Sequence, residues 1–344
     1  MNNKVRKSNI ELLRILAMFL IVFMHLLWHG NVLNSCDYGS INYYLFWSIR
    51  SLCYISVNVF VLISGYFMIY SKFNNKKLFK MILQTLFYSL VFFSISSYIN
   101  KDIFTIFNLL KSIFPISSGV YWYITSYVLL YLISPLLNNA IISMDKNELR
   151  RVIIYLFIAF SIFPTFLFWS RSFLSMGRDL NWFIFLYLVG GYIRKYNVSC
   201  KNKKLLFIFI ISIFLMIISL VLIGAITHLI FGRVKEQDLM LCFNSIFSLC
   251  ASISVFLIFL NIRINNMIFS RIVNSISKLV IGVYLFHENP FFRDILWGII
   301  NPTRFINSSI LTLLYSIFAC IMIMMIGCLI EKCRLYLLKC FHIG

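Results

Sequence analysis

Ten apolar runs, most of them long enough to cross a membrane as a helix, follow one another along this chain of 344 residues. The hydrocarbon core of a bilayer is about 30 Å thick, so a helix needs about 20 apolar residues to cross it. The runs cover residues 10–28, 47–70, 80–99, 119–140, 151–169, 181–193, 205–230, 241–261, 277–297 and 308–330. Lipid offers the backbone no hydrogen-bond partners, which favours helices because each helix satisfies its own. The sequence therefore predicts an all-α integral membrane protein, a bundle of about ten transmembrane helices in a single domain comprising residues 1–344.

Composition excludes the main alternative classes. Hydrophobic residues make up 61% of the chain and charged residues 12%, which leaves more apolar surface than a water-soluble domain can bury. The net charge of +20 does not indicate a nucleic-acid partner, because the basic residues stand in short clusters between apolar runs. The nine cysteines contain no Cys-x-x-Cys pair, so we expect neither a disulfide framework nor a metal site.

The basic residues also predict the topology. Cytoplasmic loops of membrane proteins carry an excess of Lys and Arg. If the N-terminus is cytoplasmic, most of the 31 Lys and Arg residues fall in cytoplasmic segments, and ten spans return the C-terminus to the same side. The tryptophans then all lie near outer ends of spans: Trp28, Trp47, Trp122, Trp169, Trp182 and Trp297. They fit an interfacial aromatic belt, or an outer-face pocket in which sugars lie against the rings.

Two ionisable residues in the first run indicate a function. Arg14 and His25 are eleven residues apart, which is about three full helical turns, so both lie on one stripe of one helix, about 16 Å apart along its axis. Ionisable side chains at membrane depth are costly and usually face a cavity or a partner. The two could hold the ends of one long ligand. Alternatively, Arg14 reaches the membrane surface or pairs with Glu11, and His25 bonds a neighbouring helix.

Four stretches resemble the acyltransferase 3 family of membrane acyltransferases. They are the Arg-x10-His pattern of the first run, VFVLISGYF at 59–67, GVYWYI at 119–124 and IGVYLFH at 281–287. The resemblance extends over nearly the whole chain and implies a ten-helix bundle. One stretch departs from the family pattern. After the second span the family has Arg-x-x-Arg, where this chain has Lys77-Leu-Phe-Lys80, and lysine lacks the bidentate fork of arginine.

The resemblance implies an O-acyltransferase of the bacterial cytoplasmic (inner) membrane. It would move an acyl group, most often acetyl, from cytoplasmic acyl-CoA to a hydroxyl of a cell-surface or lipid-linked carbohydrate outside the cytoplasm. Acetyl-CoA or another acyl-CoA is then a donor substrate, and no permanently bound cofactor is expected. His25 would act as the general base beside Arg14. The donor's phosphates would meet Arg14, Lys76, Lys77 and Lys80.

Further residues are candidates for the substrate pocket. They are His29, Ser64, Trp122, Tyr123, Tyr284 and His287. His29 lies one turn beyond His25 on the same stripe, where it could instead be an interfacial hydrogen-bonding residue. Ser64 precedes Gly65 without a nucleophile elbow, which is more typical of close helix packing than of a nucleophile.

A transporter or flippase for lipid-linked sugars is the alternative. Such proteins often show internal symmetry with Gly- or Pro-broken helices in corresponding halves. The prolines at 135, 164, 290 and 302 show no such pattern, which favours the enzyme. A polysaccharide polymerase is a weaker alternative, because no long outer loop with arginines is present.

Overall fold

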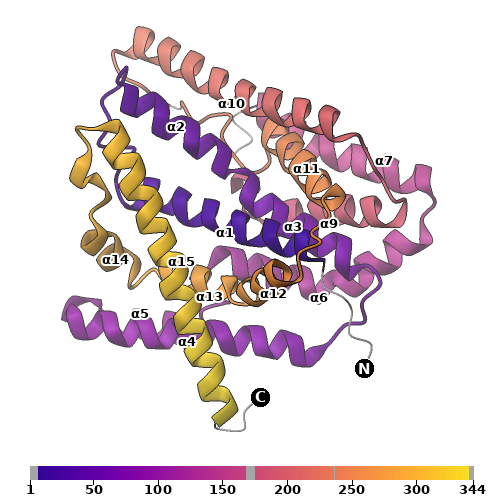
Figure 1. Cartoon of the computed structure of the whole chain (residues 1–344), viewed down its shortest axis with the longest axis horizontal. Coiled ribbons are helices and arrows are strands. Elements are labelled where there is room, and N and C mark those ends of the chain that lie inside the picture. The colour runs from indigo at the N-terminus through magenta and orange to yellow at the C-terminus, as the bar shows by residue number, and fades with distance from the viewer. Residues whose placement is uncertain (1–6, 168–174, 236, 341–344) are drawn as a thin grey trace. The chain divides into compact units, whose positions relative to one another are not determined.

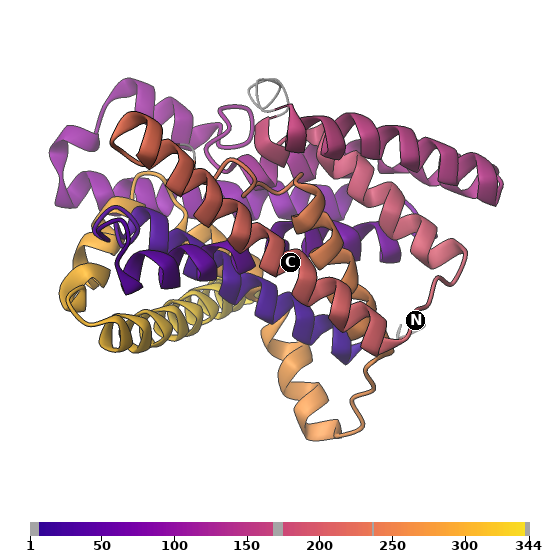
Figure 2. The same ribbon diagram turned by 90° about the horizontal axis from the view of Figure 1, so that it is seen from above.

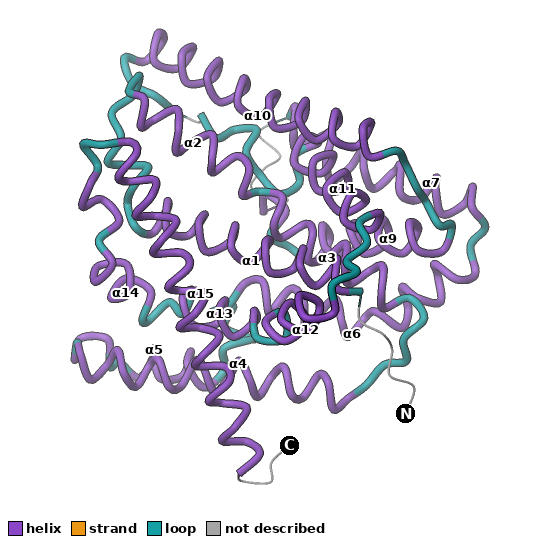
Figure 3. Tube along the Cα trace, viewed as in Figure 1, coloured by secondary structure: helices purple, strands orange, loops and turns teal. Residues whose placement is uncertain are grey.

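The computed structural model describes residues 7–167, 175–235 and 237–340, and every regular element in these residues is helical (Figure 3). Trp169, at the end of the predicted fifth span, lies outside the described residues. The α-helices are α1 (Ser8–His29), α2 (Ile41–Cys53), α3 (Ile55–Met68), α4 (Asn75–Ile99), α5 (Ile106–Ile113), α6 (Trp122–Ser143), α7 (Lys146–Phe157), α8 (Phe163–Phe166), α9 (Leu180–Lys195), α10 (Asn202–Phe231), α11 (Ile246–Asn261), α12 (Met267–Ile276), α13 (Val280–His287), α14 (Arg293–Ile300) and α15 (Ser309–Cys340). Short 3-10 turns are η1 (Lys101–Ile103), η4 (Ser175–Gly177) and η5 (Pro302–Phe305), and η2 (Ile158–Ile162) is a π-turn.

The expected membrane class is confirmed. Eight stretches of the described residues are long and apolar enough to cross a bilayer: Ser8–His29, Ile41–Met68, Asn75–Ile99, Trp122–Ser143, Lys146–Phe166, Asn202–Phe231, Met267–His287 and Ser309–Cys340. The other two predicted spans, 181–193 and 241–261, correspond to α9 and α11, which have 16 residues each. A helix of that length measures about 24 Å, which is shorter than the bilayer core. The protein is therefore an all-α integral membrane protein, and the part of the chain that the structure describes holds eight full-length candidate spans.

The predicted boundaries of the ninth span, 277–297, are wrong. The apolar stretch begins at Met267, because Asn266 caps α12 by accepting the backbone N–H of Phe269 at 2.9 Å. It ends at His287, and α14 is a separate helix beyond it. Asn289 precedes Pro290, which disfavours helical backbone at Asn289, so the chain turns there.

The chain divides into two compact units, each described by itself. The first unit comprises residues 1–46, 79–121 and 263–344, and the second comprises 47–78 and 122–262. In the first unit α13 packs against α15 and α1, and α1 also contacts α12 and α15. Figures 1 and 2 show α15, in yellow, as one unbroken helix.

A buried polar network holds α4 to α15 inside the first unit. The Arg334 guanidinium donates to both carboxylate oxygens of Glu331, at 2.6 and 2.9 Å. The Tyr88 hydroxyl and the Gln84 amide each donate to the same carboxylate at 3.0 Å. Gly282 of α13 lies so close to Glu331 and Tyr88 that an added methyl group would overlap them. The network therefore sets how closely α13 approaches its neighbours.

Glycine brings α3 and α9 together in the second unit. A methyl group on Gly65 would overlap the backbone of Tyr187, and one on Gly190 would overlap the backbone of Leu62. Small residues of this kind allow membrane helices to approach closely. The serine before Gly65 thus lies at a helix-packing point.

Candidate functional site

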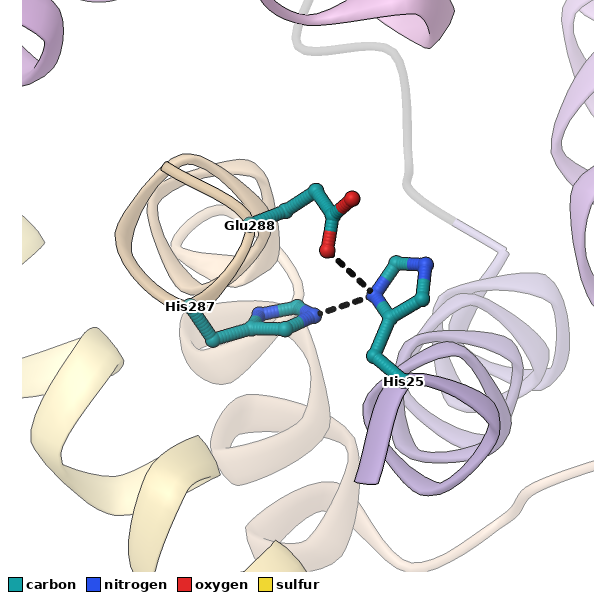
Figure 4. Close-up of side chains that lie close together, drawn as sticks. All are labelled: His25, His287 and Glu288. Atoms are coloured by element: carbon teal, nitrogen blue, oxygen red, sulfur yellow. Dashed lines mark hydrogen bonds and ion pairs between the residues drawn. The ribbon is translucent and has the colours of Figure 1, made fainter. Parts of the chain in front are cut away.

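Two histidines that are far apart in the sequence meet in the first unit. His25, near the end of α1, has its Nδ1 atom 2.9 Å from Nε2 of His287, the last residue of α13 (Figure 4). Both side chains are buried, with His287 fully enclosed. Burial in an apolar helix bundle makes a hydrogen bond between the two rings more valuable than it would be in water.

A carboxylate completes the cluster. Glu288 follows His287 directly, and its Oε2 atom lies 3.2 Å from His25 Nδ1 (Figure 4). The other oxygen, Oε1, faces two cations or potential cations: His29 Nε2 at 3.5 Å and Arg293 Nη1 at 3.6 Å. We call His25, His287 and Glu288 the His–His–Glu cluster. Glu288 was not predicted from the sequence, although an acid beside the histidine of the 281–287 stretch was a usable signal.

The contacts of His287 assign the tautomers of both rings. His287 Nδ1 lies 2.6 Å from the backbone oxygen of Val283, one helical turn earlier. A carbonyl oxygen only accepts, so Nδ1 carries the proton and Nε2 of the neutral ring is an acceptor. His25 Nδ1 must then donate to His287 Nε2. A neutral His25 consequently presents an acceptor lone pair on Nε2, at the far side of its ring.

The turn after Glu288 is held by Asn289, which is fully buried. Its side-chain oxygen accepts the backbone N–H groups of Phe291 and Phe292, at 3.0 and 3.2 Å. Its amide donates to the Tyr121 hydroxyl at 2.7 Å, and that hydroxyl donates to the Leu285 carbonyl at 3.0 Å. These bonds fix the backbone on both sides of Glu288, and so they orient its carboxylate toward His25.

The remaining candidates of the first unit differ in how far their side chains are buried. Tyr284 lies edge-on to His287, with 6.1 Å between ring centroids. Arg14 pairs with Glu11 at 3.5 Å on its own helix, and its side chain is 30% exposed. The Glu11 pairing considered from the sequence is therefore present. Lys80 is exposed near the start of α4.

The other candidates belong to the second unit. Ser64 Oγ lies 2.9 Å from the Phe60 carbonyl oxygen and 3.2 Å from the Tyr127 hydroxyl. Trp122 and Tyr123 both pack against Phe183, with ring centroids 6.3 and 5.6 Å apart. Lys76 and Lys77 are exposed in the first turn of α4. The structure thus brings together His25, His29 and His287 of the predicted set, with Tyr284 beside them.

The His–His–Glu cluster can support two kinds of chemistry. A carboxylate and a second imidazole that hold one nitrogen of a histidine leave its other nitrogen oriented to accept a proton. The same three side chains form a group whose potential metal-ligating atoms lie within 4.8 Å of one another.

One of the comparisons with known proteins identifies a family. Residues 7–332 match the family model described as an acyltransferase domain. No curated protein matches the chain, and no solved structure matches it.

Proposed function

We propose, from the premise that this chain belongs to the acyltransferase 3 family, that it is an O-acyltransferase acting on a cell-surface glycan. Membership in this family makes the protein a membrane acyltransferase and favours an enzyme over a transporter or flippase. The proposed donor is cytoplasmic acyl-CoA, most often acetyl-CoA. The proposed acceptor is a hydroxyl of a cell-surface or lipid-linked carbohydrate on the other side of a bacterial cytoplasmic membrane.

The hydrogen-bonded state of His25 is the observation that supports this proposal best. Its Nδ1 atom is hydrogen-bonded to His287 at 2.9 Å and lies 3.2 Å from the Glu288 carboxylate, so the acceptor lone pair of the neutral ring is on Nε2. An orienting acid that holds one nitrogen of a histidine stabilises the imidazolium formed when the other nitrogen takes a proton. Glu288 thus acts as a positioning residue for His25.

In the proposed reaction the acceptor's hydroxyl oxygen attacks the thioester carbonyl as His25 Nε2 removes the hydroxyl proton. A carbon–oxygen bond forms, the carbon–sulfur bond breaks, and CoA leaves as a thiolate that takes the proton back from His25. General-base help of this kind is worth about 10²–10⁴ in rate. In a second route His25 Nε2 attacks the thioester carbonyl, the carbon–sulfur bond breaks and CoA leaves as a thiolate. The acceptor hydroxyl oxygen then takes the acyl group from Nε2, the carbon–nitrogen bond breaks, and the hydroxyl proton goes to the thiolate.

Basic residues are proposed to hold the donor. Arg14 lies about 16 Å from His25 along α1, so the phosphates and the thioester of one extended acyl-CoA could meet these two side chains. Lys76, Lys77 and Lys80 are exposed at the start of α4, and the family resemblance is the reason for proposing that they also attract the donor's phosphates.

Complementation of a strain that lacks the gene tests this function. The O-acetyl content of the isolated surface glycan is measured in cells carrying the parent protein, His25→Ala or His228→Ala. His228 lies on α10, outside the cluster, and is the matched control. We expect acetylation with the parent and the control and none with His25→Ala. Full acetylation by a His25→Ala protein present at normal membrane level would refute the role of His25 as the general base.

Rapid-quench labelling with radioactive acetyl-CoA distinguishes direct transfer from the covalent route.

A further inference from the structure

The His–His–Glu cluster presents a ligand set that suits a divalent transition metal. Two imidazoles and one carboxylate are a known set for zinc, and the relevant atoms of His25, His287 and Glu288 lie within 4.8 Å of one another. We propose that this cluster binds Zn²⁺, and that the bound ion stops acyl transfer. Binding is inferred from the geometry alone, whereas inhibition rests on the proposed function of His25.

Two of the three ligand distances need only a small adjustment to receive the ion, whereas the set as a whole extends to 4.8 Å and must contract around it. Zinc lies about 2.0–2.1 Å from histidine nitrogens in tetrahedral sites, which places neighbouring ligand atoms about 3.3 Å apart. His25 Nδ1 lies 2.9 Å from His287 Nε2 and 3.2 Å from Glu288 Oε2. His287 already has the outer contact typical of a metal ligand, because its Nδ1 bonds the Val283 carbonyl and leaves Nε2 for the ion.

Two neighbours modify the affinity in opposite directions. His29 Nε2 lies 3.5 Å from Glu288 Oε1, near enough to supply a fourth ligand after a rotation of its side chain. Arg293 Nη1 lies 3.6 Å from the same oxygen and repels a cation. Because the Arg293 side chain is 28% exposed, its guanidinium can turn toward solvent when the ion enters. Removing this charge should therefore tighten binding.

The tautomer of His25 explains why the ion would inhibit. A neutral imidazole carries one proton, and a metal on Nδ1 leaves that proton on Nε2. Nε2 is then a donor and cannot accept the proton of an acceptor hydroxyl. Zinc and the Nδ1 proton thus compete for one atom, and only the protonated Nδ1 leaves His25 able to act as a base.

The binding test uses the metal-stripped, detergent-purified full chain and ZnSO₄ alone. Cys333 and Cys340 are exposed thiols that can bind zinc, so both are first replaced by Ser in every variant. X-ray absorption should show nitrogen and oxygen ligands at about 2.0–2.2 Å and no sulfur at about 2.3 Å. His287→Ala should weaken binding at least about tenfold, since even indirect partners of a metal ligand are worth that much. His228→Ala should leave the affinity unchanged, and Arg293→Gln should raise it.

Two results would overturn the metal site. One is an X-ray absorption spectrum that shows sulfur bound to the zinc. The other is an equal zinc affinity for the His287→Ala and His228→Ala proteins. Inhibition is measured separately, as transfer from acetyl-CoA at zinc concentrations that saturate the site. Continued transfer at saturation would refute inhibition and the base role of His25 Nε2, while the metal site would stand. Failure to bind zinc would remove the metal site and leave the proposed acyltransferase function untouched.

Discussion

His25 and His287 are 262 residues apart in the sequence, yet their rings share a buried hydrogen bond of 2.9 Å between Nδ1 and Nε2. The contact joins the end of α1 to the end of α13, and it places Glu288 against the same nitrogen. The hydrogen bond to His287 sets the tautomer of His25, and the Glu288 carboxylate lies beside the same nitrogen. The following predictions test this arrangement and its support.

Replacing Glu288 by Gln should lower acyl transfer by about tenfold or more, with little change in the KM for acyl-CoA. The amide has the size of the carboxylate but no charge to stabilise the imidazolium of His25. Asp294→Asn is the control, because Asp294 is 82% exposed and forms an ion pair with Arg293 rather than with a residue of the cluster. Steady-state kinetics on the purified protein provide the measurement. Equal losses in the two variants would contradict an orienting role for Glu288.

Replacing Tyr121 by Phe should destabilise the protein by about 1–3 kcal/mol and also lower kcat. The change removes the hydroxyl that bonds the Asn289 amide and the Leu285 carbonyl, which leaves both buried groups without this partner. Tyr336→Phe, at an exposed position of α15, should change neither quantity. Thermal unfolding in detergent and initial rates are measured together. A fall in stability with unchanged kcat would show that Tyr121 supports the fold and not the orientation of Glu288.

Replacing Glu331 by Gln should destabilise the protein by about 3–5 kcal/mol, because it leaves the buried Arg334 guanidinium without its carboxylate. The double variant Glu331→Gln with Arg334→Met should recover part of the loss, since no unpaired charge remains. Lys332→Met, at the exposed position between them, is the control. The measurement is the melting temperature in detergent. If the destabilising effects of the two single substitutions simply add in the double variant, the pairing of Glu331 with Arg334 is contradicted.

Saturating acetyl-CoA should raise the melting temperature of the purified protein, because a ligand that binds only the folded state stabilises it. Arg14→Ala should reduce this shift, and Lys101→Ala, on a segment predicted to face outward, should not. Competition by CoA alone would place the contact on the CoA portion of the donor and not on its acetyl group. The absence of any shift at saturating donor would count against acyl-CoA as the substrate.

Cysteine labelling of intact cells tests the topology. A cysteine introduced at position 76 should react with a membrane-impermeant maleimide only after the membrane is opened. The native Cys36, which is half-buried beyond the end of α1, should react from outside. Each is measured in a background that lacks the other native cysteines. The reverse pattern would place the N-terminus outside the cytoplasm.

The class of fold could be predicted from the sequence because it depends on local composition. Apolar runs of membrane length can only become helices in lipid, so α1 and α10 were found with bounds close to those observed. The start of α15 was also found, but the helix continues to Cys340, ten residues beyond the predicted end at 330. The predicted span boundaries were wrong where a side-chain hydrogen bond determines where a helix begins or the chain turns. Asn266 begins α12 and Asn289 supports a turn before α14, and neither contact changes the hydropathy that predicted one span over 277–297.

By itself, the sequence determined that Arg14 and His25 share one stripe of one helix, because helical periodicity fixes the angle between residues eleven apart. It also placed His287 in a family stretch near the end of an apolar run. Only the tertiary structure decided that His287 and Glu288 reach His25 Nδ1, and that Val283 assigns the tautomer. The physical reason is that these contacts depend on how α13 packs against α1 and α15. That packing is set by close approaches such as Gly282 to Glu331, between residues that no local pattern relates.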